Sequence, residues 1–165
     1  MQVAVTGHQK RDGLDWPWVA ERLRSELLQL PFVTSALSSL AVGSDQLFAR
    51  TALSMGIRHV AVIPMPGYER FFSEEGIAEY RRLLALSDSV QLPGAGTDEN
   101  SFFEAGKFVA NHCDVLFAIW DGKSAQGLGG TADVVAHARE RSKNIIQLNP
   151  ITFDTIKIMG GANGS

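Results

Sequence analysis

The sequence has little cysteine and no excess of charge of one sign. Its single cysteine, Cys113, cannot form a disulfide within the chain, and because it precedes an apolar segment we expect a buried thiol in a reducing compartment. The net charge is −3, and the chain contains no long basic run. This composition argues against the broad basic surface that gives a protein general affinity for nucleic acid.

Long apolar runs are also missing. No segment approaches the roughly 18 consecutive apolar residues that a membrane-spanning helix needs. Met1 leads directly into "QVAVTG", without the basic segment and the long apolar segment of a secretory signal. We therefore expect a cytoplasmic protein with no membrane partner. The four histidines show no shared metal-ligand spacing, so we predict neither a metal site nor a cofactor.

What the sequence does contain is an alternation of short apolar segments with longer segments of helical periodicity. The predicted strands are residues 3–7, 33–41, 59–65, 89–93, 114–120 and 144–150. The predicted helices are 16–30, 44–56, 68–87 with a break that could fall at Gly76, 101–111 and about 130–142. The start at residue 101 depends on Ser101 and Glu104, which have the spacing of a capping box.

This alternation predicts an α/β fold of the Rossmann-like, three-layer kind, with a mainly parallel sheet and helices on both faces. At 165 residues the chain is long enough for one domain with a full core and too short for two. We assign residues 1–150 to this domain. Residues 151–165 are expected to form a C-terminal tail that is flexible at its end.

Polar residues and glycines follow three of the predicted strands, in segments 6–9, 41–46 and 120–131. In open α/β sheets, ligands bind beyond the carboxyl ends of the strands. Glycine lets the backbone approach a ligand closely, and a helix N-terminus attracts phosphate. We therefore predict a phosphate site at Gly129, Gly130 and Thr131. The alternatives are that this loop merely turns and that Ser44, Asp45 and Thr131 only cap helices.

Two familiar nucleotide-binding motifs are absent. The "GLGGT" loop is not the G-x-G-x-x-G fingerprint that follows a first strand, and no Gly-Lys-Ser/Thr of a P-loop occurs. Tyr68 and Arg70 in "PGYERFF" could contact a base and a phosphate. We favour a surface aromatic–cation pair for them.

Four segments together resemble the SLOG superfamily: "VAVTGHQ", "SSLAVGSDQLFARTALSMGI", "VIPMPGYERFF" and "CDVLFAIWDGKSAQGLGGTADVVAHARE". The resemblance extends over about residues 2–149. The superfamily includes LOG-type phosphoribohydrolases, Smf-type DNA-processing proteins and sensor domains of bacterial defence signalling. It implies a nucleotide or NAD-derived small-molecule ligand across the strand ends, and a homo-oligomer.

The resemblance also implies site residues. Gly43, Ser44 and Asp45 would form one ligand loop, and Gly129, Gly130 and Thr131 the phosphate-binding loop. Gly7, His8 and Gln9 would line the floor of the site beside these loops. Asp121 and Gly122 would flank the sugar.

The sequence departs from the LOG-type pattern at the catalytic positions. LOG-type enzymes carry a glutamate after the G-T pair, whereas this chain has Val134 there, and Asp133 lies about 100° away around the helix. An arginine–lysine pair of the preceding helix falls on Ala105 and Gly106. Nucleoside deoxyribosyltransferases, a second comparison, need the same missing glutamate.

We therefore favour a sensor-type SLOG module that binds a nucleotide or NAD-derived molecule. The alternative is a phosphoribohydrolase, or another N-glycosidic hydrolase or transferase, that uses Asp121 as its catalytic carboxylate. DNA binding of the Smf type is the least favoured hypothesis, because the chain is acidic overall and has few basic runs.

Overall fold

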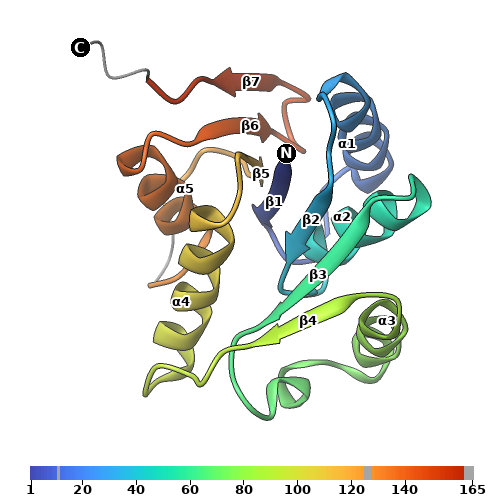
Figure 1. Ribbon diagram of the computed structural model, residues 1–165, viewed down its shortest axis with the longest axis vertical. Coiled ribbons are helices and arrows are strands. Elements are labelled where there is room, and N and C mark those ends of the chain that lie inside the picture. The colour runs from blue at the N-terminus through green and yellow to red at the C-terminus, as the bar shows by residue number, and fades with distance from the viewer. Residues whose placement is uncertain (11, 125–127, 162–165) are drawn as a thin grey trace.

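A computed structural model describes residues 1–10, 12–124 and 128–161, and within them the chain forms one seven-stranded sheet in the order β4-β3-β2-β1-β5-β6-β7 (Figure 1). The strands are β1 (Gln2–Gly7), β2 (Ser35–Ser38), β3 (Arg58–Ile63), β4 (Asp88–Gln91), β5 (Val115–Ile119), β6 (Asn144–Leu148) and β7 (Thr155–Ile158). The helices are α1 (Trp16–Gln29), α2 (Ser44–Ser54), α3 (Glu74–Ala85), α4 (Asp98–Asn111) and α5 (Thr131–Glu140), with a 3-10 turn, η1 (Tyr68–Phe71).

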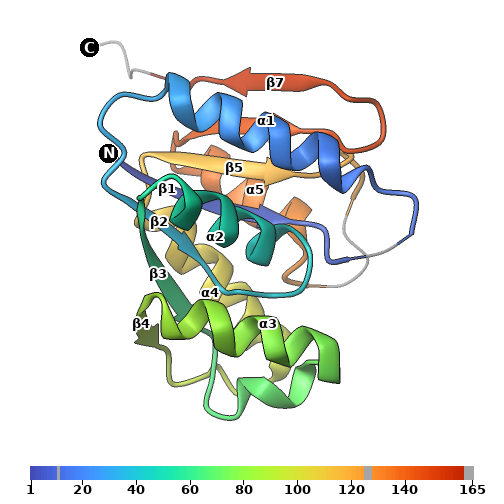
Figure 2. The ribbon, with the colours of Figure 1, turned by 90° about the vertical axis from the view of Figure 1, so that its right-hand side faces the viewer.

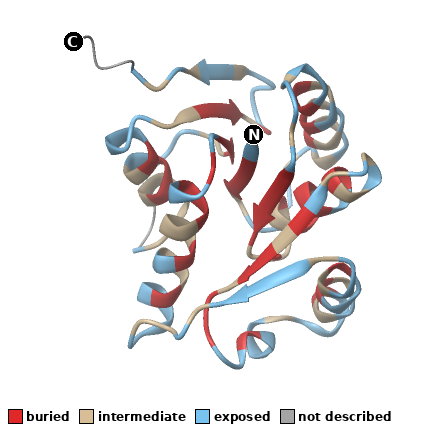
Figure 3. Ribbon diagram, viewed as in Figure 1, coloured by how far each residue is buried: buried red, intermediate tan, exposed pale blue. Residues whose placement is uncertain are grey.

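The sheet is parallel except at β7, which runs antiparallel to β6. All five residues of β5 are buried, and the interior of β1 is buried as well, whereas β4 is exposed (Figure 3). Strands that helices cover on both faces must be apolar throughout, which explains why these central segments show no alternation. The predicted α/β, Rossmann-like architecture is confirmed.

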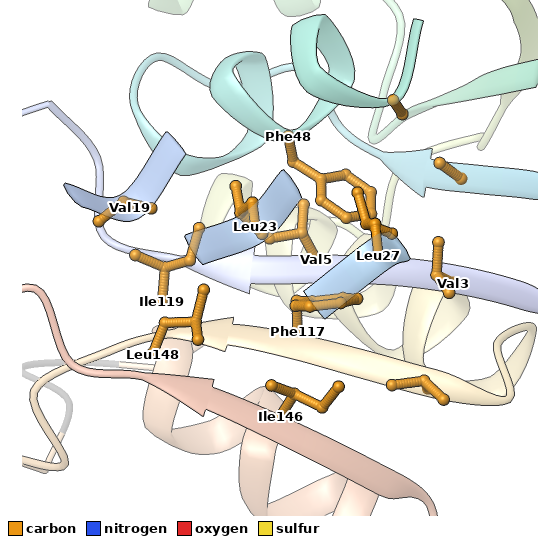
Figure 4. Packing of buried hydrophobic residues seen from close by; sticks show 13 residues of the cluster. Val3, Val5, Val19, Leu23, Leu27, Phe48, Phe117, Ile119, Ile146 and Leu148 are labelled. Atoms are coloured by element: carbon orange, nitrogen blue, oxygen red, sulfur yellow. The ribbon is translucent and has the colours of Figure 1, made fainter. Parts of the chain in front are cut away.

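Helices cover both faces of the sheet. Helices α1, α2 and α3 lie on one face, and α4 and α5 lie on the other (Figure 2). On the first face, Phe48 of α2 packs beside Phe117 of β5, with ring centroids 5.8 Å apart, among aliphatic side chains of α1 and β1 (Figure 4). On the second face, small residues of α4 allow that helix to approach α5 closely.

Two predicted helix boundaries were wrong. Helix α4 begins at Asp98 rather than at Ser101, because the Thr97 side chain accepts a hydrogen bond from the Asn100 N–H. Ser101 is buried inside the helix and donates to the Thr97 carbonyl. The segment 68–87 breaks before Ser73, which caps α3 through the Gly76 N–H, so Gly76 lies within the helix.

The segment after residue 150 contains a strand that the sequence analysis did not predict. Strand β7 pairs with β6, and two side chains of α1 hold it in place. The Lys157 ammonium lies 2.8 Å from the buried Glu26 carboxylate, as an ion pair without hydrogen-bond geometry. Arg22 Nε donates to Thr155 Oγ1 at 2.9 Å. The last residues, 162–165, lie outside the described part of the chain.

His59 of β3 is buried between two serines. Ser87 donates its proton to the Leu83 carbonyl, so its oxygen accepts from His59 Nδ1 at 2.7 Å. The other ring nitrogen, Nε2, then accepts from Ser38 Oγ at 2.9 Å. Burial lowers the pKa of His59 from 6.5 to about 4, and the neutral ring satisfies both contacts.

This histidine makes stability depend on pH. Because its pKa is lower in the folded state than in the unfolded state, the stabilisation is complete above pH 6.5 and is lost as pH falls toward 4. From pH 8 to pH 5 we expect wild type to lose about 2 kcal/mol more unfolding free energy than His59→Gln, which cannot titrate there. Urea denaturation of both proteins at the two pH values measures this difference. Equal losses would contradict the assignment.

Candidate functional site

A cavity of about 530 Å³ lies at the carboxyl ends of β1 and β5. From β1 the chain continues to β2 on one side, and β5 lies on the other side, so this is the topological switch point of the sheet. The predicted site residues that line the cavity come from three strand-end loops: Gly7, His8, Gln9, Asp45, Asp121, Gly129, Gly130 and Thr131. The fold therefore brings together segments that are more than a hundred residues apart.

Gly43, Ser44 and Gly122 were also predicted as ligand residues, and they do not line this cavity. Ser44 is buried, and both its N–H, at 3.1 Å, and its hydroxyl, at 2.7 Å, donate to the His8 carbonyl. Gly43 has φ +101°, and a Cβ there would lie 2.4 Å from the Lys10 nitrogen. These two residues join the loop after β2 to the loop after β1.

Asp45 is the ionisable residue of the second loop. One carboxylate oxygen, Oδ2, accepts hydrogen bonds from the Ser39 N–H at 2.9 Å and the Ala41 N–H at 3.4 Å. Desolvation raises the pKa of Asp45 from 3.8 to about 7, although these two bonds lower it. Ionisation of this carboxyl group, which lines the cavity, therefore lowers the stability of the folded protein.

The glycine loop leads into the N-terminus of α5. Gly130 is the N-cap residue, and no side chain among the described residues caps this helix, so the N–H groups of Thr131 and Ala132 are available to an anion. Asp133 instead accepts a hydrogen bond from the Gly129 N–H at 2.8 Å, which holds the loop in place. Gly129 has φ +87°, and a Cβ there would lie 3.1 Å from the Glu99 carbonyl of α4. Gly127 of the same loop lies outside the described residues.

His8 and Asp121 are in contact and both line the cavity. His8 Nε2 lies 3.5 Å from Asp121 Oδ1 and 3.2 Å from the Asp121 N–H. A neutral ring accepts from that N–H, and a protonated ring pairs with the carboxylate. The Lys123 N–H also donates to Asp121 Oδ1, at 3.0 Å, so the carboxylate is held by its own loop.

The part of the cavity next to α4 and α5 is apolar. Val134 is buried against Gly106, where a Cβ would lie 2.5 Å from the valine Cγ2. Ala105 and Gly106 line the cavity at the positions of the arginine–lysine pair. The neighbouring Glu104 and Lys107 pair with each other and are not among the lining residues.

Aromatic residues form a further part of the lining that the sequence analysis missed: Tyr68, Phe71 and Phe72 around η1, and Phe102 of α4. Tyr68 does not form the predicted surface pair, because it is buried among these rings. Arg70 stacks on Phe71, 4.5 Å from the ring centroid, and its Nη2 lies 3.0 Å from Asp98 Oδ1. The aromatic residues of "PGYERFF" were visible in the sequence, but the burial of Tyr68 among rings that include Phe102 of α4 was not.

Two further classes of site were searched for. In the part of the chain that the structure describes, no three His, Cys, Asp or Glu side chains gather as metal ligands. The helices described there are all too short or too polar to cross a membrane.

No protein-family model matches the sequence, and no curated protein sequence does either. Among solved structures, the chain is similar to DNA processing protein A (DprA) from Streptococcus pneumoniae, with a TM-score of 0.65 and 19% identity over 90% of this chain and 50% of DprA. The structural-genomics target TM1055 matches with a TM-score of 0.57 and 16% identity, over 87% of this chain and 71% of that one. These similarities show a Rossmann-like α/β fold. The chain spans half the length of DprA.

The carboxyl group of Asp45 should destabilise the fold at neutral pH. Because its pKa is raised in the folded state, stability is complete below pH 3.8 and is lost as pH rises toward 7. We expect Asp45→Asn to be more stable than wild type, by a margin that grows about 2–3 kcal/mol from pH 5 to pH 8. Chemical denaturation at both values measures this margin. A margin that does not change with pH would show that the carboxyl group is solvated.

Proposed function

We propose that this protein is a binding module for a nucleotide or an NAD-derived small molecule. The observation that carries the proposal is the cavity at the switch point, which combines the uncapped N-terminus of α5 with polar residues of two other strand-end loops. Its volume lies within the range of small-molecule sites. A phosphate at Gly130 and Thr131 would accept hydrogen bonds from the first turn of α5 and interact with the positive end of the helix dipole.

The lining favours binding over turnover. Hydrolysis of an N-glycosidic bond of the LOG type needs a carboxylate beside the ribose, and the buried Val134 occupies that position. Ala105 and Gly106 offer no charge to the substrate. The homo-oligomer implied by the SLOG resemblance remains part of the same proposal.

A second candidate function is hydrolysis or transfer at the N-glycosidic bond of a nucleotide. The observation in its favour is Asp121, whose carboxylate lies beside His8 in the cavity wall. In hydrolysis, water would add to C1′ of the ribose while the bond to the base breaks. Asp121 would accept the proton from water, and the departing base nitrogen would take up a proton.

The phosphate assignment is tested by Thr131→Glu. A carboxylate at the first position of α5 is compatible with the helix, but it places a negative charge where we propose a phosphate. We expect at least a tenfold loss of affinity for whichever nucleotide stabilises wild type in a thermal-shift panel of NAD, ADP-ribose, cyclic ADP-ribose, AMP and cyclic nucleotides.

The matched control is Ala136→Glu, which adds the same side chain at an exposed position of the same helix. It should bind like wild type. If Thr131→Glu and wild type bound the nucleotide with equal affinity, the assignment of a phosphate site to this helix N-terminus would be wrong.

Asp121→Asn separates the two candidate functions. For a binding module, chromatography should recover the bound nucleotide intact from wild type and from the variant. For an enzyme, wild type should release free base, and Asp121→Asn should bind the nucleotide but release base at least 100-fold more slowly. Base release at equal rates in both proteins would exclude Asp121 as the catalytic carboxylate.

A further inference from the structure

The cavity lining includes an aromatic wall formed by Tyr68, Phe71, Phe72 and Phe102, whose rings contact one another. The Phe71 and Phe102 rings meet edge to face at 4.9 Å, and Tyr68 meets Phe72 in the same way at 5.0 Å. Phe71 keeps 42% of its surface exposed although it lines a cavity. Such a wall suits a flat, aromatic ligand group.

The wall carries a hydroxyl group that has no hydrogen-bond partner among the described residues. Tyr68 is 5% exposed, and within residues 1–10, 12–124 and 128–161 its hydroxyl makes no hydrogen bond. Among the same described residues, Glu26 Oε2 is the one side-chain nitrogen or oxygen atom that is fully buried and makes no hydrogen bond. The Tyr68 hydroxyl is therefore not fully buried, and because Tyr68 lines the cavity, the hydroxyl is open to it. Buried polar groups are rarely left unsatisfied, which points to a ligand or water as the missing partner.

A carboxylate group lines the same cavity as this hydroxyl. Asp45 Oδ2 is engaged by the Ser39 and Ala41 N–H groups, whereas Oδ1 accepts no hydrogen bond within the described residues. Asp45 and Tyr68 line the same cavity. Desolvation raises the pKa of Tyr68, and the Asp45 charge raises it further. The phenol therefore stays protonated as a donor, and above pH 7 the ionised Asp45 carboxylate is an acceptor in the same cavity.

We propose that Tyr68 and Asp45 form a subsite for a nitrogen heterocycle that carries a hydrogen-bond acceptor next to an N–H donor, stacked against the Phe71 and Phe102 wall. The inference rests on the proposed function, since the phosphate of the same nucleotide would occupy the α5 N-terminus. The Tyr68 hydroxyl donates to the heterocycle, and Asp45 Oδ1 accepts from it.

Two ring systems of nucleotides present this edge. Adenine has the N1 acceptor beside its 6-amino group, and the carboxamide of nicotinamide has a carbonyl beside an NH₂ group. Each has an analogue that lacks the donor: purine riboside 5′-monophosphate for AMP, and nicotinic acid mononucleotide for nicotinamide mononucleotide. A site built to hydrogen-bond a donor rejects the analogue without it, because its own polar atom is then left unpaired.

The experiment is calorimetric titration of the intact chain with these four nucleotides and with ribose 5-phosphate, which has no base. We expect wild type to bind AMP or nicotinamide mononucleotide at least tenfold more tightly than the matching analogue, and the pair that shows the preference identifies the ring. Tyr68→Phe and Asp45→Asn should remove the preference while affinity for ribose 5-phosphate stays within about twofold of wild type.

Two variants serve as matched controls. Tyr80→Phe removes a hydroxyl from the same aromatic cluster, but Tyr80 does not line the cavity. Asp88→Asn makes the same aspartate-to-asparagine change as Asp45→Asn, but on the exposed strand β4. Both should keep the wild-type preference, and circular dichroism confirms that each variant is folded.

The outcomes separate this inference from the proposed function. If wild type binds the nucleotides but Tyr68→Phe and Asp45→Asn keep the full preference, the subsite is overturned and nucleotide binding stands. If wild type binds none of the five compounds, the proposed function fails and the subsite fails with it. If all five bind equally well to wild type, the phosphate site stands and base recognition is overturned.

Discussion

The pairing of β1 with β5 is the constraint on which the candidate site depends. Their register places Gly7 opposite Ile119, and the His8 N–H continues the ladder to the Ile119 carbonyl at 3.0 Å. His8 and Asp121 therefore leave neighbouring strands at the same level, although 113 positions separate them. The apolar content of both strands fixes this register, because helices cover both faces of the sheet and a slipped pairing would disturb the packing on each.

Several groups that lower the stability of the folded state lie around the cavity. The Asp45 carboxyl is desolvated, the Tyr68 hydroxyl has no partner in the described part of the chain, and the first turn of α5 has no side-chain cap. Each of these features disfavours the folded state, and all three face one cavity. By contrast, both ring nitrogens of the buried His59 have hydrogen-bond partners. Local costs that gather at one place are typical of functional sites.

Much of the fold could be predicted from the sequence, because the central strands are short, fully apolar and separated by helical periodicity. Strand β7 was missed because its Lys157 and Thr155 are polar, and their contacts with α1 are visible only in three dimensions. The start of α4 was misplaced because Thr97 and Ser101 are both good capping residues, and the burial of Ser101 decides between them.

The candidate site could also be predicted in part from the sequence. Glycine-rich strand ends indicate where a ligand can approach, and several of these residues do line the cavity. The sequence could not show that Gly43 and Ser44 serve the contact between two loops, because glycine and serine suit both roles. Tyr68 was misassigned because its burial depends on Phe102, which lies 34 positions away in α4.

The double hydrogen bond from Ser44 to the His8 carbonyl has a consequence for how the cavity can widen. It makes the loops after β1 and β2 a single mechanical unit, whereas the loop before α5 is braced against α4 through Gly129. The two units meet where His8 touches Asp121. Local opening follows cooperative units of this kind, so the loops after β1 and β2 would move together when the cavity widens.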